Sequence, residues 1–152
     1  MGTTPAASES PGARQWTQLR ALLEEIRVRN PFYRAKLNSI TPAFASLEDF
    51  SNRCPFTTKQ ELADDQAAHP PFGSNLTFPL EHYTRLHQTS GTSGRPLVWL
   101  DTPANWDWMI GNWFTIFEAA GVTRRDRICF AFSFGPFIGF WLAFEASARL
   151  GC

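Results

Sequence analysis

The chain has 152 residues, of which 43% are hydrophobic and 14% aromatic, enough for one ordinary domain with an apolar core. Fourteen basic residues balance fourteen acidic ones, so the charge indicates neither a nucleic-acid partner nor an anionic membrane surface. The three cysteines are widely spaced, odd in number and outside any metal-binding pattern. They fit incidental, reduced thiols in a cytoplasmic protein.

Residues 1–12 are rich in Thr, Ala, Ser and Pro and lack the apolar segment of a signal peptide. We therefore expect a disordered tail, followed by one incomplete domain over residues 13–152. A helix is predicted over Ala13–Arg29, because its apolar side chains recur at helical spacing. Asn30-Pro31 should end this helix.

Two short helices are expected next. Ser46 is a candidate N-cap for the first. Thr58 is a candidate N-cap for the second, and Glu61 stands at the matching capping-box position. The proline-rich segment His69–Gly73 that follows should be a loop.

The next stretch reads Thr89-Ser90-Gly91-Thr92-Ser93-Gly94-Arg95-Pro96. Its glycines permit unusual backbone angles, and its hydroxyl and N–H groups are donors suited to phosphate oxygens. Arg95 adds a fixed positive charge. The flanking segments favour strands, so the stretch should join the two strands of a hairpin. The spacing excludes a Walker P-loop, which ends in Gly-Lys-Ser/Thr and opens a helix. The alternative is a flexible hairpin loop that binds nothing.

A long helix should begin at the N-cap Thr102, with Pro103 in its first turn, and stop at Gly121. Its aromatic stripe indicates core. Residues 128–144 then carry no charge, which is close to the length of a membrane span. Gly135-Pro136 interrupts that run, and we prefer a buried strand over Arg127–Phe132 followed by a helix over Phe137–Leu150. The loop between them is either a ligand site or a packed aromatic corner.

Taken in order, several pieces resemble the phenylacetate–CoA ligase family of the adenylate-forming superfamily. The pieces are Asn30-Pro31-Phe32-Tyr33-Arg34, Pro55-Phe56-Thr57-Thr58-Lys59, Pro71-Phe72-Gly73, His87 with the stretch 89–96, and Phe132-Ser133-Phe134-Gly135-Pro136-Phe137. The resemblance implies part of the N-terminal domain of an α/β enzyme. In chain order it would hold N-terminal helices, a β-hairpin phosphate loop, a helix and a buried strand–helix unit.

The resemblance also implies a function. The enzymes of this family join a carboxylic acid to coenzyme A through an acyl-adenylate, using ATP and Mg²⁺. It assigns the ATP phosphates to Thr89, Ser90, Gly91, Thr92, Ser93, Gly94 and Arg95. It assigns an aryl-acid pocket to Phe132, Phe134, Gly135, Phe137 and Gly139.

Three motifs of the family have no counterpart in the chain: an acidic ATP–magnesium motif, a ribose-binding aspartate and an adenylate-directed lysine. No catalytic residue or metal ligand is therefore assigned. We expect the N-terminal third of such a ligase, inactive alone, with a missing C-terminal portion or a second copy as protein partner. The alternatives are a non-catalytic remnant that binds nucleotide or a partner chain, and a structural fragment that binds nothing.

Overall fold

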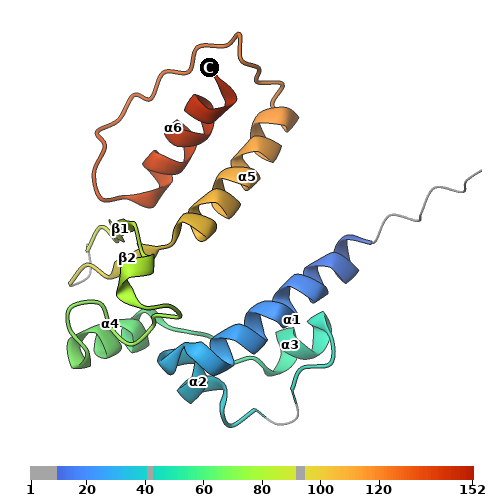
Figure 1. Cartoon of the computed structure of the whole chain (residues 1–152), viewed down its shortest axis with the longest axis vertical. Coiled ribbons are helices and arrows are strands. Elements are labelled where there is room, and N and C mark those ends of the chain that lie inside the picture. The colour runs from blue at the N-terminus through green and yellow to red at the C-terminus, as the bar shows by residue number, and fades with distance from the viewer. Residues whose placement is uncertain (1–9, 41–42, 92–94) are drawn as a thin grey trace, which may run out of the picture. The chain divides into compact units, whose positions relative to one another are not determined.

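The structure is a computed structural model that describes residues 10–40, 43–91 and 95–152. The chain divides into two compact units, Met1–Phe78 and Pro79–Cys152. The described residues form six α-helices, a short 3-10 helix and one two-stranded sheet. The expected α/β class is thus corrected to a mostly helical fold with a single hairpin (Figure 1).

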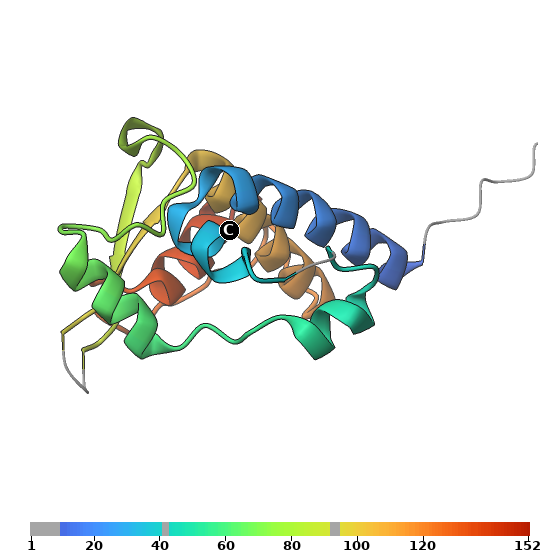
Figure 2. The ribbon, with the colours of Figure 1, turned by 90° about the horizontal axis from the view of Figure 1, so that it is seen from below.

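The first unit begins with α1 (Pro11–Arg29), which the spacing of apolar residues predicted from Ala13 onward. The helix starts two residues earlier, inside the expected tail, because Ser10 caps it by accepting from the Ala13 N–H. Asn30 caps the end of α1 and the beginning of α2 (Pro31–Leu37), so the chain changes direction there without leaving the helical region for long. Pro31 suits the first position of α2, because proline has no N–H to satisfy and a helical φ. The helix α2 was not predicted; it turns off α1 and packs beside it (Figures 1 and 2).

Two further helices of this unit begin at the predicted caps. Ser46 accepts from the Asp49 N–H at the start of α3 (Leu47–Arg53). Thr58 and Glu61 form a full capping box at the start of α4 (Lys59–Ala68). A core of Leu23, Leu37 and Phe44 holds the helical part of the unit together.

The second unit begins with the 3-10 helix η1 (Leu80–His82), and the hairpin follows. Strand β1 (Arg85–Gln88) pairs antiparallel with β2 (Val98–Asp101), with Gln88 opposite Val98. The stretch 89–97 therefore joins two strands, as the sequence indicated.

Helix α5 (Pro103–Ala119) has the predicted N-cap Thr102, and α6 (Ile138–Leu150) lies beside it (Figure 1). Gly121 follows α5 with φ +70°, and two backbone bonds close the helix end in a Schellman motif: Val122 N–H to Phe117 O, and Gly121 N–H to Glu118 O. The aromatic stripe of α5 is largely core, as expected. The buried residues of this core are Trp106, Ile110, Phe117 and Ala146.

The buried strand expected over Arg127–Phe132 is wrong. This segment has no strand partner, and Cys129, Ala131 and Phe132 are exposed. A strand needs a neighbour to receive its backbone hydrogen bonds, and the only strands among the described residues, β1 and β2, pair with each other. The helix expected from Phe137 begins one residue later, at Ile138. No helix of the described residues is long and apolar enough to cross a membrane.

Candidate functional site

The base of the Ser/Gly/Thr loop is fixed by Thr89 and Leu97. The Thr89 N–H donates to Leu97 O at 3.0 Å, and the Leu97 N–H donates to Thr89 Oγ1 at 2.9 Å. The Thr89 hydroxyl accepts the second bond, so its own O–H still has a proton to donate. This pair of hydrogen bonds extends the hairpin by one residue pair beyond the β1–β2 ladder and fixes both ends of the loop.

The described residues that flank the tip of the loop include two that are exposed to solvent. Gly91 has φ +68°, a region that favours glycine, and Ser90 and Arg95 are exposed. The predicted phosphate ligands Thr92, Ser93 and Gly94 lie outside the described residues. The described residues of the loop therefore offer hydroxyl, N–H and guanidinium donors, and none of them carries a carboxylate.

The structure brings this loop next to the predicted acid-binding segment. The Gln88 N–H, at the last position of β1, donates to Pro136 O at 2.7 Å. Pro136 lies near the end of the aromatic segment Phe132–Phe137, two residues before α6 begins. This backbone hydrogen bond lies across the free edge of β1 and joins positions 88 and 136, which are 48 residues apart. It connects the residue directly before the predicted phosphate loop to the predicted acid-binding segment.

The aromatic segment packs against one face of α6. Phe132 stacks on Phe140 with ring centres 4.2 Å apart, and Phe134 lies 4.7 Å from Trp141. The Trp141 indole N–H donates to Gly135 O at 2.8 Å, which fixes the turn. Phe132, Phe134 and Phe137 are 37%, 40% and 36% exposed, so each ring keeps one open side.

The two glycines predicted for the pocket differ. A Cβ added to Gly135 would lie 3.2 Å from two ring atoms of Phe137, so the absence of a side chain there allows that ring to close over the turn. A Cβ on Gly139 would meet nothing within 4 Å. Gly135 therefore shapes the aromatic segment, whereas Gly139 borders open space.

A polar cluster that the sequence did not single out supports the hairpin. Arg85 pairs through both guanidinium nitrogens with Glu145 of α6, at 2.5 and 2.9 Å. Trp106 of α5 donates its indole N–H to Glu145 Oε2 at 2.8 Å. Next to it, the buried His87 stacks on Trp106 and places Nδ1 3.2 Å from Asp101 Oδ2. The signals that could have found this cluster are the charges at the ends of the two strands and Glu145, the one carboxylate of the mostly apolar helix α6.

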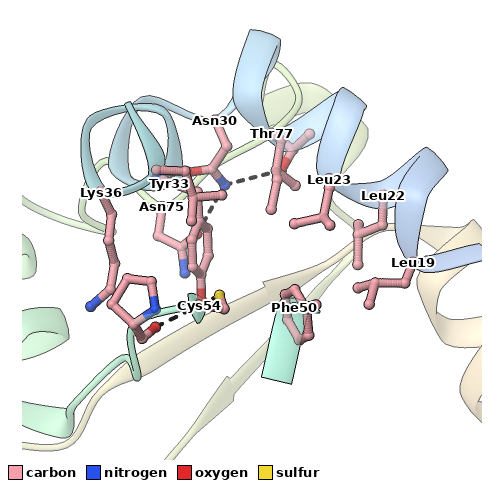
Figure 3. Close-up of a pocket in the computed structure, with 13 residues that line it drawn as sticks. Leu19, Leu22, Leu23, Asn30, Tyr33, Lys36, Phe50, Cys54, Asn75 and Thr77 are labelled. Carbon is pink, nitrogen blue, oxygen red and sulfur yellow. Dashed lines mark hydrogen bonds between the residues drawn. The ribbon is translucent and has the colours of Figure 1, made fainter. Parts of the chain in front are cut away.

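The first unit contains a separate cleft of about 300 Å³ (Figure 3). Apolar side chains of α1 and α2 line one side, and Phe50, Cys54 and Pro55 line another. At one end the Asn30 amide donates to Asn75 Oδ1 and Thr77 Oγ1. Leu22 of α1 is 52% exposed beside this cleft.

The chemistry of the cleft is that of an apolar surface with a satisfied polar end. Burial raises the pKa of the Cys54 thiol, which keeps it protonated and unreactive at neutral pH. Lys36 lines the cleft too, but its ammonium group is paired with Glu61 at 2.5 Å. Nothing in the cleft therefore rivals the loop region as a candidate for phosphate chemistry.

Comparison with known proteins agrees with the order of these elements. No model of a protein family matches the chain. The chain is 34% identical over 146 residues to phenylacetate-coenzyme A ligase of Escherichia coli (strain K12), and 31% identical over 145 residues to that of Pseudomonas putida. Each alignment covers 91% of this chain and 31% of the relative. The chain is a homologue of the phenylacetate-coenzyme A ligases.

Solved structures of a 2-hydroxyisobutyryl-CoA ligase share the fold of this phenylacetate-coenzyme A ligase homologue. An open conformation in complex with 2-HIB-AMP and CoA matches with a TM-score of 0.82 and 29% identity. It covers 98% of this chain and 38% of the solved one. The complex in the thioesterification state matches with a TM-score of 0.83 and 30% identity, covering 98% and 35%. The homologue thus spans about a third of the length of the proteins it matches.

Proposed function

We propose that the chain provides the phosphate-binding and acid-binding parts of an ATP-dependent acid–thiol ligase. In the proposed reaction a carboxylate attacks the α-phosphorus of ATP, pyrophosphate leaves, and the thiol of coenzyme A then displaces AMP from the acyl-adenylate. The observation that carries the proposal is the Gln88–Pro136 hydrogen bond, which holds the two predicted binding segments side by side. Adenylation needs that proximity, because its two substrates must meet in line.

The phosphate role falls to the loop from Thr89 to Arg95, including Thr92, Ser93 and Gly94. Hydroxyl and N–H groups would orient the β- and γ-phosphates, and Arg95 would neutralise part of their charge. The acid would lie against the open sides of Phe132, Phe134 and Phe137. Flat aromatic faces favour an aryl acid over a short aliphatic one.

The described residues do not fit a magnesium site of their own. No three His, Cys, Asp or Glu side chains among them converge on a point where a metal ion could be held. Mg²⁺ is commonly held by substrate phosphates and few protein ligands, so it would arrive with the nucleotide. No residue of the chain is assigned to Mg²⁺ or to coenzyme A.

Titration of the chain with ATP tests the phosphate role. Arg95→Ala should weaken binding by tens-fold, because a charge-assisted contact to phosphate contributes on the order of 2 kcal/mol. Arg95→Lys should recover part of the loss. Arg125→Ala is the matched control, since Arg125 is an exposed arginine of the same unit in the turn after α5. Equal affinities of wild type and Arg95→Ala would refute the assignment.

A further inference from the structure

Three side chains brace the hairpin against the two helices of the second unit: Arg85 of β1, Trp106 of α5 and Glu145 of α6. Both Glu145 oxygens receive a guanidinium nitrogen of Arg85, and Oε2 also receives the Trp106 indole N–H. The guanidinium group lies 4.6 Å from the centre of a Trp106 ring. One carboxylate thereby ties together three elements of secondary structure.

The environment makes this brace stronger than a surface ion pair. The Glu145 side chain is 19% exposed and Trp106 is 2% exposed. The Arg85 side chain is 36% exposed, so solvent still screens part of the attraction, but less than in a fully exposed pair, and the forked geometry fixes its direction. A second ion pair, Arg149–Asp107, also joins α6 to α5, but its side chains are 44% and 62% exposed. That pair provides a natural comparison, because surface pairs contribute little.

The brace holds β1 at one end, and the candidate site holds it at the other. Arg85 is the first residue of β1, and Gln88 is the last; the Gln88 N–H donates its hydrogen bond to Pro136 O. Pro136 lies two residues before the start of α6, and Glu145 lies within α6. The strand is therefore attached to the α6 region at both ends, and a displacement at one attachment reaches the other because the intervening strand is short and packed.

We propose that Glu145 is a positioning residue that couples the phosphate loop to the acid-binding segment. Through Arg85 and Trp106 it sets β1 against α6, and so fixes Thr89–Gly91 relative to Gly135–Phe137. Binding of a ligand at the phosphate loop should then raise the affinity of the acid-binding segment for its own ligand. The reverse should hold as well, because coupling between two sites is reciprocal. The ligand part of this inference rests on the proposed function, whereas the mechanical coupling does not.

Amide spectra of the ligand-free ¹⁵N-labelled chain test the coupling. Glu145→Gln keeps the size of the side chain and an acceptor for the Trp106 N–H but removes the charge. We expect the amide signals of Gly91 and Gly135 to move together in this variant. They should stay in place in the control Arg149→Gln, which breaks the exposed pair between the same two helices. Shifts confined to the neighbours of residue 145 would overturn the proposal.

ATP titration adds a readout that a purely structural role would not give. Glu145→Gln should bind ATP about tenfold more weakly than wild type, within the usual range of coupling between sites. Arg85→Lys, which keeps the charge and loses the fork, should lie between them. In the wild type, ATP should also shift the Gly135 amide, and this shift should shrink in Glu145→Gln.

The two hypotheses fail in different ways. If the wild-type chain binds no ATP while Gly91 and Gly135 still move together in Glu145→Gln, the proposed function fails and the coupling stands. If the wild type binds ATP and Glu145→Gln binds it equally with an unmoved Gly91 signal, the coupling fails and the function stands. Should Glu145→Gln not fold, the same comparisons are made with Arg85→Lys, and an unmoved Gly91 signal there overturns the coupling.

Discussion

Asn30 is a buried polar residue of the first unit whose side chain makes three hydrogen bonds. It is 3% exposed, and its side-chain oxygen accepts the Tyr33 N–H at the start of α2. Its amide nitrogen donates to Asn75 at 2.9 Å and to Thr77 at 3.1 Å (Figure 3). One side chain therefore caps a helix and attaches the segment after α4 to it.

Asn30→Ala should destabilise the chain by about 3 kcal/mol. Loss of the N-cap costs about 1 kcal/mol, and each of the two hydrogen bonds to Asn75 and Thr77 contributes about 1 kcal/mol more. Asn30→Asp should cost about 2 kcal/mol, because a carboxylate still caps Tyr33 but cannot donate to either partner.

Urea denaturation followed by circular dichroism measures these differences. Ser46→Ala is the matched control, because the Ser46 side chain caps α3 by accepting one exposed hydrogen bond from the Asp49 N–H. It should cost about 1 kcal/mol. If Asn30→Ala is no more destabilising than Ser46→Ala, the attachment through Asn75 and Thr77 contributes nothing and the reasoning is wrong.

Three further outcomes are expected. The hydrogen bond from Lys36 lowers the pKa of Glu61 from 4.5 to about 2. The contribution of ionised Glu61 to folding stability is therefore complete above pH 4.5 and is lost as the pH falls through about 2. Glu61→Gln should therefore flatten the acid limb of a stability–pH curve; an unchanged limb would contradict this. Phe137→Ala should cost about 2 kcal/mol, less than for a fully buried ring because Phe137 is 36% exposed, and should reduce the preference for phenylacetate over acetate in binding assays. Gly111→Ala should stabilise the chain by about 1 kcal/mol, whereas Gly121→Ala should destabilise it by about as much, because neither Cβ meets an atom within 4 Å but only Gly121 has a positive φ; equal thermal midpoints would show that backbone strain is not the cause.

Local signals predicted the helices well. The apolar repeat placed α1, and the caps Ser46, Thr58 and Thr102 placed the starts of three other helices. These features act within one turn of the chain, so the sequence contains all of the interacting partners. The end of α1 at Asn30 was predicted for the same reason. The start of α2 directly after it was not predicted, because Asn30 caps both helices and no loop residues separate them.

The strand expected over Arg127–Phe132 shows the limit of such reasoning. Apolar β-formers describe what a strand would contain, but strand formation depends on a neighbouring backbone that lies far away in the sequence. The described residues offer that segment no such neighbour. By contrast, β1 and β2 have each other nearby, and the hairpin was predicted.

The sequence by itself determined the capped starts of α3, α4 and α5, the hairpin and the composition of the two predicted binding segments, since these follow from local spacing and residue chemistry. The tertiary structure alone decided which segments meet. The Gln88–Pro136 bond, the Asn30 contacts and the Arg85–Glu145 pair each join residues 45 or more positions apart. No pattern in the sequence specifies such a pairing, because it depends on how separate elements pack, and packing is a property of the folded chain.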